Sequence, residues 1–212
     1  MTFSETPGEA KQKECHRLIM ESLSQDYLQL ELVDEIKIHE NLNNSQTKIA
    51  CSVRVKGETF AIVGTGKGPV DAFYSSLSKV LSDEYTSLNN FYFLEFGIRA
   101  NLLKRTGNLS SGSDALVEAL LVLRNIDGND FIFRAKDCSL IGASMKAALN
   151  AIEYLINLEE AVVKVHTAIK DAQGRRRDDL VRKFTNKLIR LVDRGSYEEA
   201  IRRKREEDNW QV

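Results

Sequence analysis

The sequence has few of the residues that several protein classes require. Its 212 residues include two prolines, one tryptophan and three histidines. No apolar segment approaches the roughly 18 uninterrupted residues of a membrane-spanning helix. The N-terminal stretch MTFSETPGEAKQKE lacks the basic start and apolar run of a secretory signal. We therefore expect a cytoplasmic protein that does not contact a membrane.

Metal-binding and catalytic patterns are also absent from the sequence. The cysteines are too few and too widely spaced for a disulfide framework or a zinc site, and the histidines lack metal-ligand spacing; these residues are Cys15, Cys51, Cys138, His16, His39 and His166. No Cys-His pair is expected, because the neighbours Cys15 and His16 point to different helix faces and Cys51 fits the buried side of a strand. We expect no catalytic residues, no metal and no cofactor.

Charge gives no indication of a nucleic-acid partner. The formal net charge is −1, although residues 159–212 hold 14 Lys/Arg against 11 Asp/Glu. The basic clusters at 175–177 and 202–205 adjoin acidic residues, so their local fields largely cancel. We expect solvated helix faces there, with no nucleic acid bound.

The first half of the chain changes its hydrophobic period twice. Thr6-Pro7-Gly8-Glu9 is typical of a helix start, and we expect that helix to end near Tyr27. A period of two then predicts a three-stranded meander with a turn at 56–58, through Ile36, Ile38, Ile49, Cys51, Val53, Val55, Phe60 and Ile62. A helical face follows from Gly68 onward, formed by Val70, Phe73, Leu77, Val80 and Leu81.

The same order of periods recurs in the second half. Strand-like segments at 91–100, 115–124 and 131–135 precede a helix from about 140 to 155, with a turn at 127–129. A shift of 71 residues places Gly57 on Gly128 and keeps the apolar helix face, matching Val70 to Ile141, Ala72 to Ala143, Leu77 to Ala148, Val80 to Ala151 and Leu81 to Ile152. We predict an α+β fold of two βββα units related by a pseudo-two-fold axis, with added N- and C-terminal helices.

The remaining residues are helical and highly charged. A break is expected at Gln173-Gly174, followed by a helix that ends at Arg194-Gly195 and a capping box at Ser196 that opens a short last helix. The apolar stripe of the middle helix, formed by Leu180, Phe184, Leu188 and Leu191, either completes the chain's own core, which we favour, or docks a partner. The predicted divisions are a helix at 1–27, a domain at 28–157 with units 28–85 and 86–157, and an extension at 158–212.

The glycine-rich stretch GTGKGPVDAF at 64–73 leads into the first of the two long helices. It is not a P-loop, because Gly68 and Pro69 follow Lys67 where a Ser/Thr is required. It also lacks the third glycine of a dinucleotide fingerprint. A strand-to-helix turn remains, in which glycines permit unusual backbone angles and free amides hold an anion. A plain structural turn is the alternative that the motif alone favours.

Three stretches in order resemble one known family. They are Gly66-Lys67-Gly68-Pro69-Val70-Asp71-Ala72, Gly112-Ser113-Asp114-Ala115, and Ala143-Ser144-Met145-Lys146-Ala147-Ala148-Leu149-Asn150-Ala151. Over about residues 28 to 157 the chain is similar to the regulatory (allosteric or dimerisation) domain of α-isopropylmalate synthase and citramalate synthase. That family has two βββα units. The chain departs from its pattern at 134–142, where the usual glycines, Asp and Glu are replaced.

The resemblance implies a binding site and an absence of catalysis. In the family, the feedback amino acid lies between the two turn regions near a dimer interface, and the chemistry belongs to a separate (β/α)8 barrel that this chain is too short to include. Amides of Gly66, Gly68 and the helix start at Val70 are then expected to hold a ligand carboxylate. The implied ligand-binding residues are Gly66, Gly68, Val70, Asp71, Ala72, Gly112, Asp114, Ala115, Ser139 and Ala143.

Two functional hypotheses follow from the resemblance. The first is a non-catalytic homodimer that senses a branched-chain amino or keto acid and acts in trans on a synthase subunit. The second is a dimerisation or adaptor module that has lost its effector, which the departures at 134–142 favour. The initial Met and the capped first helix favour a complete product.

Overall fold

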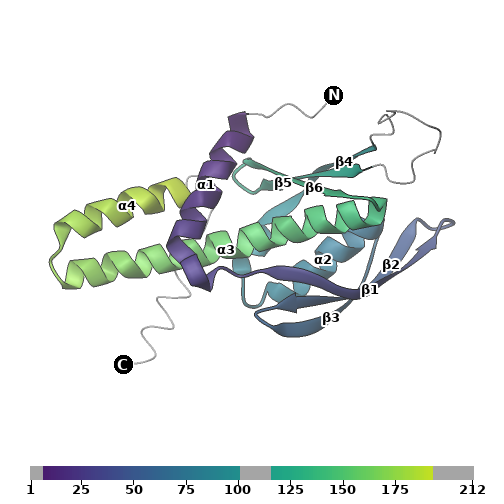
Figure 1. The fold of residues 1–212 in the computed structure, drawn as a ribbon, viewed down its shortest axis with the longest axis horizontal. Coiled ribbons are helices and arrows are strands. Elements are labelled where there is room, and N and C mark those ends of the chain that lie inside the picture. The colour runs from purple at the N-terminus through teal and green to yellow at the C-terminus, as the bar shows by residue number, and fades with distance from the viewer. Residues whose placement is uncertain (1–6, 101–115, 193–212) are drawn as a thin grey trace, which may run out of the picture.

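The computed structural model describes residues 7–100 and 116–192 (Figure 1). The helices in these ranges are α1 (Pro7–Leu23), α2 (Pro69–Leu81), α3 (Leu140–Gly174) and α4 (Asp178–Val192), with short 3-10 helices η1 (Ser24–Asp26) and η2 (Thr86–Asn90). The strands are β1 (Leu30–Asn41), β2 (Gln46–Val55), β3 (Glu58–Gly66), β4 (Phe91–Ala100), β5 (Val117–Asn125) and β6 (Asp130–Asp137). The predicted capping box at Ser196 and the helix after it lie outside the described residues.

The strands form two antiparallel sheets of three, in the orders β1-β2-β3 and β4-β5-β6. Both meanders use a glycine in the left-handed region at the second hairpin, with φ of 84° at Gly57 and 83° at Gly128. Such angles strain residues that have a Cβ. These two glycines are the pair that the shift of 71 residues aligns, and the α+β fold of two βββα units is confirmed.

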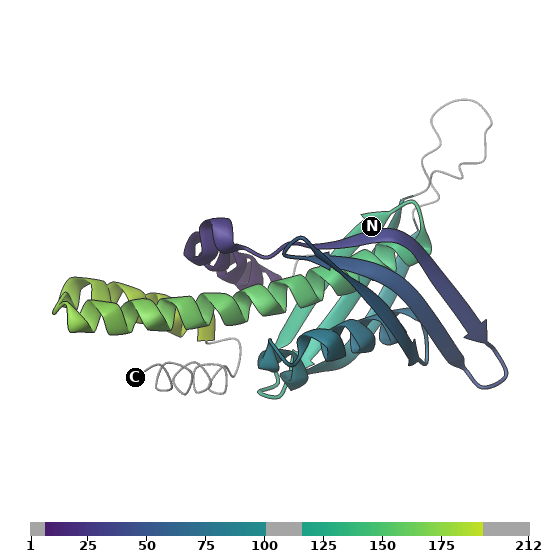
Figure 2. The ribbon, with the colours of Figure 1, turned by 90° about the horizontal axis from the view of Figure 1, so that it is seen from below.

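The two sheets enclose α2 and the N-terminal part of α3 (Figures 1 and 2). Helix α2 packs on β2 and β3, helix α3 packs on β5 and β6, and the two helices contact each other. The shared core includes the fully buried side chains of Phe73, Leu77, Ile62, Leu121 and Phe131. Each unit therefore buries the apolar face of its sheet against one helix, as the change of period from two to 3.6 predicts.

Tyr74 of α2 is also buried in this core, where its ring meets the edge of Phe93 at a centroid separation of 4.8 Å. Burial raises the pKa of Tyr74 to about 12. An unfolded chain releases this proton near pH 10, so the stability that this hydroxyl contributes is fully present below pH 10 and is lost as the pH rises toward 12.

We expect Tyr74→Phe to flatten the alkaline part of the stability profile. The wild type should lose about 2 kcal/mol between pH 9 and 12 through this hydroxyl. Y74F should lose less, although not nothing, because burial raises the pKa of Tyr85 to about 12 as well. Chemical denaturation at pH 8, 10 and 11.5 measures the difference. If the wild type and Y74F lost the same stability between pH 8 and 11.5, the raised pKa of Tyr74 would be contradicted.

Helix α1 covers one edge and one side of the second unit. Its Gln12 side chain donates to the carbonyl oxygen of Ile132 at 3.0 Å and accepts from the amide of the same residue at 2.9 Å, which closes the free edge of β6. An ion pair of 2.8 Å joins Glu9 to Arg134. In the described residues α2 has no such cover, and this difference breaks the pseudo-symmetry.

Val80 shows the consequence of that difference. The sequence predicts it on the buried face of its helix, but its side chain is 46% exposed, whereas its counterpart Ala151 is fully buried. Helix α1 packs against α3, and within the described ranges no equivalent helix packs on α2. The expectation for Val80 is therefore wrong. The two helices have matching apolar faces, but only α3 has α1 as a neighbour in the described residues.

The second long helix is longer than the sequence predicts. It does not end near Leu155 but continues as α3 to Gly174, without interruption across the predicted division between 157 and 158. Its apolar face continues through Leu158, Val162 and Val165, all buried. The predicted break at Gln173-Gly174 is confirmed.

After that break, α4 folds back along α3, and both project from the sheets (Figure 1). The predicted stripe of α4 packs on the chain's own core, with Leu191 fully buried and Phe184 and Leu188 partly buried. None of the helices in the described ranges combines the length and apolar character needed to cross a membrane.

Candidate functional site

The predicted glycine-rich turn connects β3 to α2. A Cβ on Gly64 would lie 1.4 Å from Ser76 Oγ, and a Cβ on Gly66 would lie 2.5 Å from the amide nitrogen of Ala72. Among the described glycines, only Gly57 and Gly128 have positive φ, so the expectation of unusual backbone angles in this turn is wrong. The strand and helix approach too closely for side chains at these positions.

Asp71 closes this turn from inside the chain. Its Oδ2 accepts a hydrogen bond from the amide of Lys67 at 2.8 Å, and its Oδ1 accepts from the hydroxyl of Ser75 at 3.2 Å. Pro69 occupies the first helical position, where a backbone N–H is not needed. The turn therefore binds a carboxylate at the backbone amide of Lys67, and this carboxylate is the side chain of Asp71 in the same turn.

The second turn connects β6 to α3 and is built in a similar way. The Oδ1 of Asp137 accepts from the amide of Ser139 at 2.8 Å, and Lys146 pairs with the other oxygen. Lys146 and the Ser139 amide hold the pKa of Asp137 below its usual range. Ser139 caps α3 by accepting from the amide of Gly142 at 3.2 Å.

Where one turn has a glycine, the equivalent position of the other turn has an aspartate. The shift of 71 residues places Gly66 on Asp137 and Asp71 on Gly142. In the first turn the strand supplies the glycine and the helix the carboxylate, while in the second turn these roles are reversed. A Cβ on Gly142 would lie 2.8 Å from the carboxyl carbon of Asp137, just as one on Gly66 would lie 2.7 Å from Asp71 Oδ2. Each turn thus folds one carboxylate over one glycine.

The predicted site residues differ in how far they are exposed. Gly66, Gly68 and Asp71 are partly exposed and Ser139 is exposed, whereas Val70 is 9% exposed and Ala72 and Ala143 are fully buried. Both turns lie at the end of the molecule where α2 and α3 begin (Figures 1 and 2). Gly112, Asp114 and Ala115 lie outside the described residues.

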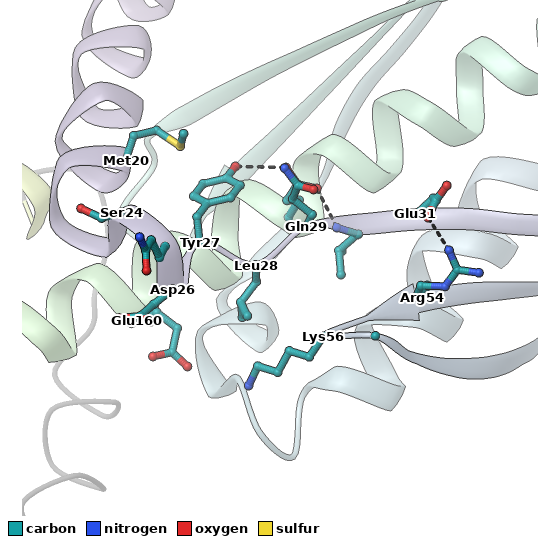
Figure 3. Close-up of a pocket in the computed structure, with 14 residues that line it drawn as sticks. Met20, Ser24, Asp26, Tyr27, Leu28, Gln29, Glu31, Arg54, Lys56 and Glu160 are labelled. Atoms are coloured by element: carbon teal, nitrogen blue, oxygen red, sulfur yellow. Dashed lines mark hydrogen bonds and ion pairs between the residues drawn. The ribbon is translucent and has the colours of Figure 1, made fainter.

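A separate groove of about 1150 Å³ lies between η1, the start of β1, the β2–β3 hairpin and α3 (Figure 3). Its two basic side chains are paired, Arg54 with Glu31 at 2.7 Å and Lys56 with Glu84 at 2.9 Å. Glu153, which also lines it, is about 20 Å along α3 from the second turn at 1.5 Å per residue. The groove is therefore remote from the predicted site.

Polar side chains of α3 hold the chain next to this groove, and sequence patterns gave no indication of them. Glu153 accepts from the amide of Leu30 at 2.8 Å and from the hydroxyl of Tyr27 at 3.0 Å. Burial and the Glu153 carboxylate raise the pKa of Tyr27. Asn157, fully buried, accepts from the amide of Leu28 and donates to its carbonyl oxygen, each at 2.8 Å. These contacts fix the connection between α1 and β1.

Comparison with known proteins adds three relatives. The chain is 36% identical over 103 residues to the 2-isopropylmalate synthase of Dictyoglomus turgidum, covering 49% of this chain and 18% of that protein. It is 28% identical over 107 residues to the probable 2-isopropylmalate synthase of Methanosarcina acetivorans, covering 50% and 18%. It is 25% identical over 128 residues to the probable 2-isopropylmalate synthase of Archaeoglobus fulgidus, covering 60% of this chain and 22% of that protein. The matched part is therefore about a fifth of each relative's length.

A family model agrees with these matches. The LeuA allosteric (dimerisation) domain matches residues 9–156, which run from the first turn of α1 through both βββα units into the middle of α3. This match covers well over half of the 212 residues. The rest of α3 and all of α4 lie beyond it. The chain belongs to the LeuA allosteric (dimerisation) domain family.

Proposed function

We propose that this chain is a non-catalytic, self-associating regulatory protein that senses a branched-chain amino or keto acid and acts in trans on an isopropylmalate-type or citramalate-type synthase. The observation that carries the proposal is the family match over residues 9–156 to a domain described as allosteric and dimerising. Relatives named as 2-isopropylmalate synthases match about half of the chain, which suggests the class of enzyme regulated.

We place the effector at the β3–α2 and β6–α3 turns. Both turns already hold a carboxylate on a backbone amide, at Lys67 and at Ser139, so their geometry suits the carboxylate of an amino or keto acid. The effector carboxylate would lie at the start of α2 beside Gly66 and Gly68. Ala72 and Ala143 have no exposed surface, so they would lie beneath the bound effector. They would contact it directly only if the two turns moved apart.

Calorimetry tests the sensing proposal. We expect heat of binding for at least one of leucine, isoleucine, valine and their keto acids at millimolar concentration. Gly68→Ala should weaken that binding, because a Cβ there meets no other atom within 4 Å and so narrows the turn without disturbing the fold. Absence of heat with all six compounds would contradict sensing.

A second candidate function is an adaptor module without an effector. The carboxylates of Asp71 and Asp137 favour it, because each occupies an amide that a ligand would otherwise use. This candidate predicts a null result in calorimetry together with capture of a synthase by the tagged full-length chain. Binding of any of the six compounds would contradict it.

The activity of a synthase tests the proposed action in trans. We expect the purified chain to change the activity of a synthase that lacks its own regulatory domain, and the change to depend on the effector found by calorimetry. Unchanged activity with and without the effector, at saturating amounts of the chain, would contradict action in trans and leave the sensing proposal standing.

A further inference from the structure

The four outer strands of the two sheets differ in how their free edges are protected. The edge of β6 is closed at Ile132 by Gln12. The pairing of β1 is interrupted by a bulge between Val33 and Lys37, where Asp34 has a φ of 63°. Bulges and charged residues of this kind are common devices against pairing with another sheet.

Within the described residues, the outer edge of β4 is open from Glu95 to Ala100. The pairing of β4 with β5 shifts by one residue between Phe93 and Glu95 and is continuous from there to Ala100. The two charged residues of β4, Glu95 and Arg99, have opposite signs. Strand β4 pairs only with β5 in the part of the chain that the structure describes, and it contains no proline or lysine. Four of its large apolar side chains are exposed, at 51%, 44%, 40% and 39% for Tyr92, Leu94, Phe96 and Ile98. On β3, the other uncovered outer strand, only Val63 is an exposed large apolar residue. A long, apolar and unpaired strand edge is a template for another strand.

We propose that β4 pairs antiparallel with β4 of a second copy of this chain, about a two-fold axis at Gly97, so that two three-stranded sheets become one of six strands. This inference rests on the self-association proposed above and names the surface that performs it. Closed two-fold dimers bring one patch against itself, so the patch must be complementary to its own rotated copy.

The charges on β4 select the register. Rotation about Gly97 places Glu95 opposite Arg99 of the second copy, and it does so twice. A register centred on Glu95 would place two carboxylates opposite each other, and one centred on Arg99 would oppose two guanidinium groups. Opposite charges across a strand pair stabilise it and like charges destabilise it. The two charged side chains of this strand therefore favour Gly97 as the centre.

The same register also suits the apolar side chains. It brings Phe96 of each copy opposite Ile98 of the other, an aromatic and a β-branched residue, which is a favourable cross-strand pair. Both are now about 40% exposed although they lie on strand positions paired with the buried Leu121 and Ala119. Pairing would cover them and extend the core across the axis.

Sedimentation velocity and cross-linking test the proposal on the full-length chain. We expect the wild type to sediment as a dimer, with a mass twice that of its 24.0 kDa monomer. Glu95→Arg should weaken dimerisation at least tenfold because it opposes the Arg99 of the second copy, and the double variant E95R/R99E should restore it. Val63→Glu, a charge on the exposed face of β3, is the matched control and should leave the dimer intact.

Cross-linking tests the register itself. A Cβ at Gly97 would make only an ordinary contact, 3.9 Å from Leu120 Cβ, so Gly97→Cys should fold. With the exposed Cys138 replaced by serine, a short bis-maleimide should join two copies through G97C but not through V63C.

The possible failures separate the two proposals. A wild type that is monomeric at tens of micromolar contradicts self-association and with it the pairing of β4. A wild-type dimer that E95R leaves intact and that G97C does not cross-link contradicts the pairing alone. A dimer that E95R disrupts and E95R/R99E does not restore contradicts the register.

Discussion

Replacing Gly66 with alanine is expected to lower the free energy of unfolding by about 3 kcal/mol, the upper range for inserting a methyl group into a packed site. The new Cβ would lie 2.5 Å from the amide nitrogen of Ala72 and 2.8 Å from its Cα. These are backbone atoms of α2, so no rotation of a side chain relieves the contact, and the helix must move away from β3. Thermal or urea denaturation measures the loss.

Gly68 provides the matched control for this prediction. It lies two residues later in the same turn, has an extended φ of −160°, and an added Cβ would have no atom within 4 Å. We expect Gly68→Ala to change stability by less than about 0.5 kcal/mol, as for an ordinary surface substitution. Equal losses for G66A and G68A would show that glycine flexibility, and not close approach, explains the turn.

The strand order and both hairpins could be predicted because they depend on local patterns. Alternation of apolar residues located the first three strands, and strand-like apolar segments located the other three. Gly57 and Gly128 marked turns where a positive φ is required. The glycine-rich turn was located for the same reason. Its mechanism could not be predicted, because the contacts of Gly64 and Gly66 come from the next helix and not from their own backbone angles.

The features that sequence patterns missed depend on contacts between distant residues. Gln12 and Ile132 are 120 positions apart, and neither residue type indicates that a helix side chain will close a strand edge. The exposure of Val80 and the burial of Ala151 likewise depend on which helix receives α1 as a neighbour. The swapped positions of glycine and aspartate in the two turns likewise depend on a contact across each turn, of Asp71 with Gly66 and of Asp137 with Gly142.

A buried amide on α3 is the second position where we expect a large effect. Asn157 is fully buried and accepts from the amide of Leu28 at 2.8 Å while it donates to the carbonyl oxygens of Leu28 and Glu153 at the same distance. A helix residue 129 positions away in sequence thus satisfies both backbone groups of one residue in the connection from α1 to β1.

We expect Asn157→Ala to cost about 3 kcal/mol of stability, because it leaves two backbone groups of Leu28 without partners and adds a small cavity. Asn157→Asp should cost at least as much, since a carboxylate keeps the acceptor for the Leu28 amide but places negative charge against two carbonyl oxygens in a buried site. Urea denaturation measures both losses. Hydrogen exchange should also show the Leu28 amide exposed in N157A well before global unfolding.

Asn150 is the control on the same helix, because it is exposed and makes a single long contact of 3.4 Å to the carbonyl oxygen of Arg134. Its replacement by alanine should be nearly neutral. If N157A proved as mild as N150A, the amide of Leu28 would have to find water in the open groove beside Tyr27. The connection between α1 and β1 would then be held mainly by Glu153, and the clamp assigned to Asn157 would be wrong.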